Sequence, residues 1–274
     1  MEQFKEQIRK AAQEALIDLI GFAGRERFDG LDPQANPFTL FPKGRTVIMV
    51  ARRITRGTLR GVEEGINFGD FGMFGKHWLA DEFVAQSVYS LANFLETAGW
   101  EAMPVAPGTR QAVAGVAEPV APDFRYAAVA CGLGEIGLGG EVLTPRFGPR
   151  QRFAMIITDA ELASDRLLDQ PVCTRCGRCI AICPLQALDG QKLTAVTVGG
   201  KSMPVATCDT KRCAICKNGA TLEGQQLDRL AALCVRTCVD ELDGQSFASG
   251  FRKRQAWGKN EFGEPVEIVE GGQA

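Results

Sequence analysis

The first 160 residues of the chain alternate between helix-like and strand-like hydrophobic patterns. Apolar residues recur every three to four positions over residues 4–19 and again over 81–97, which predicts two amphipathic helices. Short apolar runs at residues 46–51, 100–105 and 153–158, the first and last containing β-branched residues, predict buried strands. Alternation of this kind indicates an α/β (α+β) domain.

A different pattern begins near residue 169. Nine of the ten cysteines lie between Cys173 and Cys238, among glycine, proline and polar residues. We therefore expect three regions: an α/β cofactor and substrate domain over residues 1–168, a cysteine-rich module over 169–241, and a C-terminal tail over 242–274. The tail has few signals beyond the basic residues 252–254 and Trp257, and we expect it to pack on the main body or to extend to a partner.

Composition narrows the class of protein. The 274 residues are 45% hydrophobic and 23% charged with a formal net charge of -2, which argues against a nucleic-acid binder or a charged membrane-surface protein. Residues 1–10 contain no apolar signal region, and no apolar run approaches the ~18 residues of a membrane span. We expect a cytoplasmic protein with no membrane contact. In a reducing cytosol, clustered cysteines favour metal binding over disulfides.

The first cysteine run has the form C-x2-C-x2-C-x3-C-P and consists of Cys173, Cys176, Cys179 and Cys183 before Pro184. Two-residue spacing lets one tight turn present three thiolates to an iron-sulfur cube while its amides bond the sulfides. Zinc, the alternative, usually takes four ligands in two paired knuckles. The fourth cysteine follows one helical turn later and points away, and in two-cluster ferredoxins it binds the other cluster. The run therefore predicts 4Fe-4S clusters.

A second, less regular group of cysteines supplies the remaining ligands. Cys234 and Cys238 stand four residues apart on a predicted helix that includes Leu227 and Leu230, so their thiols share one face. They repeat the relation of Cys179 to Cys183, which suggests that each pair divides between two clusters. By that logic one cluster binds Cys173, Cys176, Cys179 and Cys238, and the other binds Cys183, Cys234 and two of Cys208, Cys213 and Cys216.

Eight ligands from nine cysteines leave one spare. Residues 217–219, directly after Cys216, have the composition of a turn that leaves the site, which favours Cys208 and Cys213 as ligands and Cys216 as the spare. A chelate of Cys213 and Cys216 with Cys208 free is the open alternative.

A glycine-rich segment over residues 131–140 contains a formal G-x-G-x-x-G at Gly132, Gly134 and Gly137. A dinucleotide site would need a helix directly afterwards and an acidic residue about 20 positions on. Asp159 stands at about that distance, but the glycines and prolines over residues 139–149 exclude the helix. We expect instead a backbone surface that a large flat cofactor or a cluster can approach closely.

This glycine segment, the following Leu-Thr-Pro-Arg-Phe-Gly-Pro-Arg, a short strand and then the cysteine run resemble the corrinoid-dependent iron-sulfur reductases, namely epoxyqueuosine reductases and reductive dehalogenases. The similarity is densest over residues 124–188. It implies a nitroreductase-like N-terminal domain that holds cobalamin against a cluster, followed by a C-terminal two-cluster ferredoxin-like module. The chain departs from the family in its second cysteine group, which has no proline after Cys238.

The resemblance also implies roles for particular residues. Asp123 and Tyr126 lie where the family places its proton donor, although Asp123 can equally be a helix cap and Tyr126 a core residue. The implied cofactor-binding residues belong to the glycine segment and the turn after it: Gly132, Gly134, Glu135, Gly137, Arg146, Phe147 and Gly148.

Three hypotheses for function follow. The first is an oxidoreductase in which electrons pass from a ferredoxin or flavodoxin through two 4Fe-4S clusters to a corrinoid, which reduces a small-molecule or modified-nucleoside substrate. The second is a non-catalytic dicluster electron-transfer protein or reductive activator. The third is a subunit whose catalytic centre is completed by a partner chain.

Overall fold

The computed structural model describes residues 1–223, 226–246, 256–259 and 263–268. The N-terminal part contains α1 (Glu2–Glu14), β1 (Leu19–Gly24), η1 (Arg25–Phe28), η2 (Pro37–Thr39), β2 (Thr46–Arg53), η3 (Arg56–Leu59), α2 (Arg60–Glu63), the π-helix η4 (Phe71–Val84), α3 (Ala85–Thr97), β3 (Ala102–Val105), α4 (Phe124–Ala130), β4 (Glu135–Ile136), β5 (Val142–Leu143) and β6 (Gln151–Thr158). The rest contains α5 (Arg178–Ala181), β7 (Leu188–Val198), β8 (Lys201–Cys208), α6 (Thr210–Ala214), β9 (Thr221–Glu223), β10 (Gln226–Asp228), α7 (Leu233–Ser246), β11 (Ala256–Lys259) and β12 (Pro265–Ile268).

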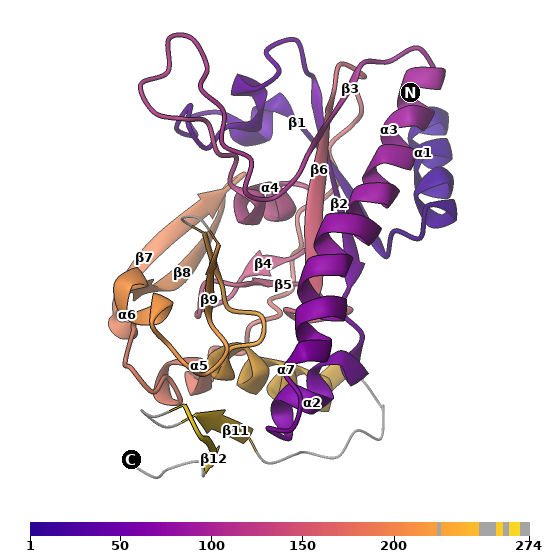
Figure 1. The fold of residues 1–274 in the computed structure, drawn as a ribbon. Coiled ribbons are helices and arrows are strands. Elements are labelled where there is room, and N and C mark those ends of the chain that lie inside the picture. Colours follow the sequence, from indigo (N-terminus) through magenta and orange to yellow (C-terminus); the bar gives the residue numbers. More distant parts are fainter. Residues whose placement is uncertain (224–225, 247–255, 260–262, 269–274) are drawn as a thin grey trace.

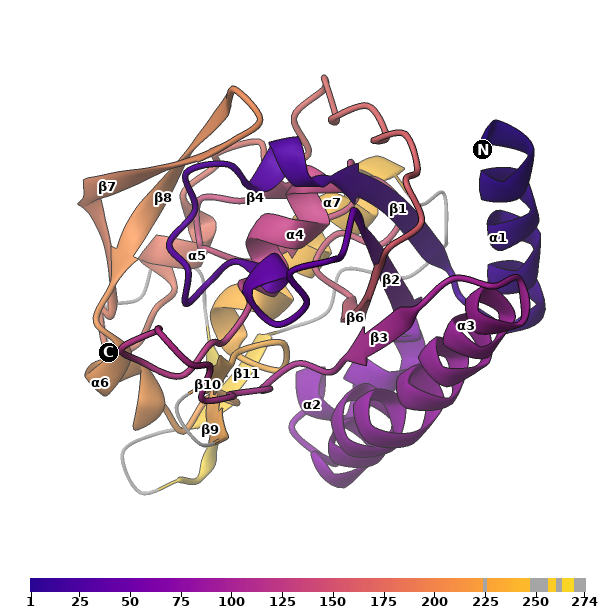
Figure 2. The ribbon, with the colours of Figure 1, turned by 90° about the horizontal axis from the view of Figure 1, so that it is seen from above.

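A four-stranded sheet of order β1-β2-β6-β3, antiparallel at every pairing, forms the centre of the N-terminal part. Helices α1 and α3 cover one face, and α4 lies on the other (Figures 1 and 2). The strands follow the two-residue period of a sheet buried on both sides. Ile48 and Ile156 pack among α1 and α3, whereas Met49 and Met155 pack against α4. The expected mixed α/β class is therefore confirmed.

The predicted strands over residues 46–51 and 153–158 are confirmed as β2 and β6. The third, predicted to begin at residue 100, begins at Ala102. The first helix was predicted too long, because Leu16 adopts a positive φ of 60° and Leu19 already opens β1. The second helix is longer than predicted, because the π-helix η4 runs directly into α3.

The glycine-rich segment forms a small hairpin, β4 paired with β5, on the α4 side of the sheet. Three residues after Gly137 the chain turns back through Gly140, whose φ is 89°, and enters β5. A strand thus stands where a dinucleotide site would require a helix, which agrees with the expected exclusion of that site.

The cysteine-rich module surrounds a core of its own, in which cysteines pack with small and aliphatic residues such as Ala187, Leu188 and Val235. The long hairpin β7–β8 extends from one side of it, and α5 packs on α7 beneath the sheet (Figure 1). The helix expected to carry Cys234 and Cys238 is α7, but Leu227 belongs to β10 because the helix begins only at Leu233.

Buried ion pairs connect the module to the N-terminal domain. Asp228 pairs with Arg152 of β6 at 2.8 Å, and both side chains are at most 15% exposed. Arg56 pairs with Glu63 at 2.7 Å and with Asp240 of α7 at 3.2 Å. Removing one partner of such a pair would leave a charge buried without compensation. The two regions are therefore packed against each other through specific charges.

Helix α7 continues past residue 241, the expected end of the cysteine-rich module, and ends at Ser246. Beyond it, the described part of the tail is the antiparallel hairpin β11–β12. The basic residues 252–254 lie outside the described residues. Within the described residues, no helix combines the length and the apolar character that crossing a bilayer requires.

Candidate functional site

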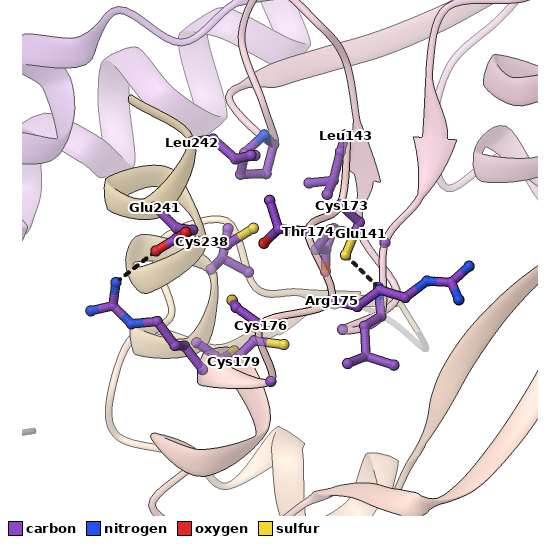
Figure 3. Close-up of a pocket in the computed structure, with 18 of the residues that line it drawn as sticks. Glu141, Leu143, Cys173, Thr174, Arg175, Cys176, Cys179, Cys238, Glu241 and Leu242 are labelled. Carbon is purple, nitrogen blue, oxygen red and sulfur yellow. Dashed lines mark hydrogen bonds and ion pairs between the residues drawn. The ribbon is translucent and has the colours of Figure 1, made fainter. Parts of the chain in front are cut away.

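The largest cysteine-lined pocket, here called the first pocket, lies where the glycine hairpin, the first cysteine run and α7 meet. Including the solvent at its mouth, it holds about 590 Å³. Figure 3 shows the sulfur atoms of its cysteines around the cavity, with Leu143 and Leu242 beside them. Four of its cysteines are those expected to share one cluster: Cys173, Cys176, Cys179 and Cys238. Thr174, Arg175 and Cys176 are exposed at its mouth.

The thiols of the first pocket crowd one another. Burial raises the pKa of Cys238, and the charges of Cys179, Cys173 and Cys176 raise it further. The pKa of Cys179 is raised by burial and then by Cys173 and Cys176. Four thiolates therefore cannot coexist here without a compensating cation. The backbone N–H of Leu138 donates to Cys173 Sγ at 3.4 Å, a bond of the kind that stabilises cluster thiolates.

Glu135 fixes the start of the cysteine run. Its Oε1 accepts hydrogen bonds from the backbone N–H groups of Val172 at 2.8 Å and Cys173 at 2.6 Å. Its other oxygen lies 3.4 Å from Lys201 Nζ, and the carboxylate side chain is 7% exposed. The resemblance implied that Glu135 binds cofactor, and the structure commits its carboxylate to the loop that presents the cysteines.

Glycine backbone forms one wall of the first pocket. A Cβ at Gly139 would lie 3.3 Å from Cys179 Sγ, and one at Gly137 would lie 3.6 Å from Cys173 Sγ. Both sulfur atoms thus approach the hairpin at contact distance, as expected for a glycine surface that a cluster approaches. Gly132 and Gly134 pack elsewhere, because their Cβ positions meet the carbonyl oxygens of Arg166 and Leu143.

A second pocket of about 340 Å³ lies inside the module. Its cysteines are Cys183, Cys213, Cys216 and Cys234, and Cys213 and Cys234 are at most 9% exposed. The backbone N–H of Ala187 donates to Cys183 Sγ at 3.2 Å. Cys216, expected as the spare, therefore lines the pocket together with Cys183 and Cys234, the two cysteines of the four-residue pairs that were expected to bind the second cluster.

Cys208, expected as a ligand, is not among the residues that line the second pocket. It is hydrogen-bonded to Cys213, which lowers the pKa of Cys208 and raises that of Cys213. Cys208 therefore contacts Cys213 without lining the pocket itself. This placement favours the alternative in which Cys213 and Cys216 chelate and Cys208 is free.

The donor sets of both pockets fit iron-sulfur clusters. The first is lined by five cysteines and the second by four, with Cys234 common to both, and each has a backbone N–H group that donates to a cysteine sulfur and a cavity of several hundred cubic ångströms. Nowhere in the described residues do three or more His, Cys, Asp or Glu side chains converge as a single-ion site. An all-thiolate iron-sulfur centre held here would supply one-electron transfer.

The two candidate catalytic residues are both engaged in local structure. Asp123 caps α4, accepting hydrogen bonds from the backbone N–H groups of Arg125 and Tyr126. The hydroxyl of Tyr126 donates to the carbonyl oxygen of Arg27 at 2.9 Å, and its ring packs against Phe28. Burial raises the pKa of Tyr126, and Asp29 raises it further. Neither residue lines the two pockets.

The turn after the glycine hairpin also packs internally. Arg146 is exposed and stacks its guanidinium over the ring of Phe147, 4.9 Å from the centroid, while Phe147 itself is buried. Gly148 has a φ of 56° and packs against Leu242. Pro149 is the residue of this turn that lines the first pocket. Among the seven residues expected to bind a cofactor, Gly137 lines that pocket and the other six do not.

Sequence reasoning missed two charged groups at the pockets. Arg229 lines both of them and pairs with Glu141 at 2.8 Å. Burial opposes the charge of Arg229, but Glu141 and then the thiolates of Cys234 and Cys208 raise its pKa. The available signal was an Asp-Arg pair in an apolar stretch just before the helix of Cys234. Arg178 pairs with Glu241 at 2.9 Å and joins α5 to α7 beside the first pocket (Figure 3).

No protein-family model matches the chain. Over 112 residues, 40% of its length, it is 37% identical to the tetrachloroethene reductive dehalogenases of Desulfitobacterium hafniense and Dehalobacter restrictus. A 101-residue match to that of Sulfurospirillum multivorans is 32% identical. Each match spans 18% of the relative's length.

Solved structures of epoxyqueuosine reductases and of a reductive dehalogenase share the fold of this chain. Epoxyqueuosine reductase from Bacillus subtilis superposes with a TM-score of 0.57 at 18% identity, covering 90% of this chain and 67% of that one. A reductive dehalogenase described as suggesting a mechanism for B12-dependent dehalogenation gives 0.57 at 19% identity, covering 84% of this chain and 30% of that one. Epoxyqueuosine reductase in a complex with an epoxyqueuosine-modified tRNA stem loop gives 0.57 at 18% identity, covering 89% and 66%.

The chain thus joins a sheet with helices on both faces to a cysteine module with thiol-lined pockets, in a fold that it shares with these solved structures. The resemblance to the corrinoid-dependent iron-sulfur reductases, the superfamily of epoxyqueuosine reductases and reductive dehalogenases, is confirmed.

Proposed function

We propose that the chain is an oxidoreductase that moves single electrons through two 4Fe-4S clusters to a corrinoid, which reduces an organic substrate. The observation that carries the proposal is the first pocket, in which four cysteines from two distant segments surround a cavity against glycine backbone. A reduced ferredoxin or flavodoxin would supply the electrons. A small molecule or a modified nucleoside would receive them, by analogy with the named relatives.

In this proposal the first cluster binds Cys173, Cys176, Cys179 and Cys238. The second binds Cys183, Cys213, Cys216 and Cys234, because these four line the second pocket. Cys179 lies in α5 and Cys183 follows two residues after its end, while Cys234 and Cys238 lie on α7, so two helical segments connect the two sites. Electrons would enter one cluster and leave from the other.

The corrinoid would meet the first pocket at its mouth, where Cys176 is exposed beside Thr174 and Arg175. Within a nitroreductase-like domain, the bound corrinoid would supply low-potential cobalt chemistry. The contribution of the chain is to hold the first cluster at that opening, with Glu135 fixing the backbone of the cysteine run. The role of Glu135 is thus positional.

One observation favours a second function, a dicluster electron-transfer protein or activator whose partner chain carries the catalytic centre. Both candidate proton donors are engaged away from the pockets, Asp123 as a helix cap and Tyr126 on the carbonyl oxygen of Arg27. The exposed edge of the first pocket would then deliver electrons to the partner.

Anaerobic reconstitution separates these functions. We expect about eight irons and eight sulfides per chain, together with cobalamin retained through gel filtration. Full iron content without retained cobalamin would favour the electron-transfer protein. Iron well below this amount, with zinc in its place, would refute both functions.

A further inference from the structure

Arg229 lies in the wall that the two pockets share. Three residues line both cavities, Leu188, Arg229 and Cys234, and Arg229 is the one with a permanent charge. Its side chain is 8% exposed. A positive charge is therefore buried between the two sites that the proposed function fills with clusters.

The guanidinium of Arg229 is held in place from the glycine hairpin. Its Nη2 lies 2.8 Å from Glu141 Oε1 and donates to the carbonyl oxygen of Gly139 at 2.8 Å. The preceding residue, Asp228, is fixed by Arg152 at 2.8 Å. Glu141 and Gly139 thus hold the guanidinium, and Arg152 holds the neighbouring residue. These contacts keep the charge of Arg229 in place when a cluster changes oxidation state.

Reduction adds one electron to a cluster that four thiolates already make negative. A fixed cation nearby stabilises the reduced form more than the oxidised form, and burial weakens the screening of that effect by water. Hydrogen bonds and charges outside the ligand set are known to tune metal centres in this way. A cation in a shared wall acts on both centres at once.

We propose that Arg229 is a shared electrostatic regulator that raises the reduction potentials of both clusters together. The proposal rests on the proposed function only in requiring that both clusters bind. Glu141, which lines the first pocket alone, partly offsets the charge of Arg229 there.

The test is an anaerobic redox titration of the reconstituted full-length chain, followed by electron paramagnetic resonance. In Arg229→Gln both midpoint potentials should fall. The ratio of reduced to oxidised cluster at a fixed potential should drop about tenfold, roughly 59 mV for a one-electron couple. Arg229→Lys, which keeps the charge, should remain closer to the wild type.

Arg178→Gln is the matched control, because Arg178 lines the first pocket only and is 31% exposed. It should lower the first potential alone, and by less. Glu141→Gln removes the negative charge that opposes Arg229 and should raise the reduction potential of the first cluster. This variant keeps Arg229, so the test does not depend on whether Arg229→Gln folds.

Unchanged potentials in Arg229→Gln, or a shift in one cluster only, would overturn the proposal. If that variant fails to hold both clusters, the absence of an upward shift in Glu141→Gln overturns it instead. Iron content distinguishes the two levels of failure. A wild-type chain without clusters refutes the proposed function, whereas intact clusters with unshifted potentials refute only the role of Arg229.

Discussion

The two cysteine pockets differ in how the chain builds them. The first combines the glycine hairpin of the N-terminal domain with the first cysteine run and α7, and Cys176 stands exposed at its mouth. The second is made entirely by the module, and Cys213 and Cys234 are buried. The first pocket therefore depends on the packing of two regions, and the second on the module alone. In the proposed function, this makes the first cluster the exit toward the substrate.

The largest expected effect comes from replacing each of the two cysteines of α7 by serine in separate variants. Cys238→Ser should abolish the first cluster and Cys234→Ser the second, so each should retain about four of roughly eight irons. Iron and sulfide analysis together with electron paramagnetic resonance measures this. If both variants lost the same resonance, the division of α7 between the pockets would be wrong.

Cys208 and Cys216 form a matched pair of test positions, because Cys216 lines the second pocket and Cys208 does not. Cys216→Ser should remove about half of the iron, since Cys216 lines the cavity, whereas Cys208→Ser should retain both clusters. The same iron analysis applies. The reverse pattern would restore Cys208 as the ligand, as the turn after Cys216 first suggested.

Glu135→Ala should destabilise the loop that presents the cysteines of the first pocket and leave the second pocket unchanged. It leaves two backbone N–H groups without their acceptor and Lys201 without its carboxylate partner, so we expect the free energy of unfolding to fall by about 3 kcal/mol. Glu135→Gln keeps an acceptor and should cost about 1 kcal/mol. Denaturant unfolding of the reconstituted protein measures both, and equal losses would show that charge alone matters.

Gly139→Ala tests the close approach of the hairpin to sulfur. The added methyl group would lie 3.3 Å from Cys179 Sγ, so we expect slower loading of the first cluster and a destabilisation of about 1 kcal/mol. Gly57→Ala is the control, because no atom lies within 4 Å of its Cβ position. Identical loading kinetics for both variants would contradict the role of Gly139 as a wall of the pocket.

The smallest effect is expected at Tyr126, which lines neither pocket. Tyr126→Phe removes one hydrogen bond to the carbonyl oxygen of Arg27, which should cost about 1 kcal/mol of stability. Cluster content and the rate of substrate reduction should stay at wild-type levels. A large loss of turnover with normal stability would instead establish Tyr126 as a proton donor.

Much of the fold was predictable because its signals are local. Strands β2 and β6 carry continuous apolar runs, and α3 carries a clear helical period. The helix over residues 4–19 was predicted too long because Ala15 and Leu19 fit its apolar period, although the positive φ of Leu16 ends it. The π-helix before α3 has no comparable period, so its extent could not be read from the pattern.

The candidate site divides in the same way. Spacing alone predicted that Cys173, Cys176 and Cys179 act together, and the repeated four-residue interval pointed to Cys238 as their companion. Cys208 and Cys216 could not be separated from spacing, because the hairpin β7–β8 and helix α6 decide which of them faces the cavity. The sequence left two roles open for Asp123 and Tyr126, a catalytic one and a structural one. Their hydrogen bonds match the structural roles, Asp123 as a helix cap and Tyr126 as a packed residue.

By itself the sequence determined which chemistry to expect of this protein, since cysteine spacing along a few turns of backbone is enough to predict thiolate ligation and to exclude a dinucleotide helix. Only the tertiary structure decided where the charges lie. Arg229 is 88 residues from Glu141 and 90 from Gly139, yet it meets both in the wall between the pockets. Such placement depends on packing between distant segments, which no local pattern encodes.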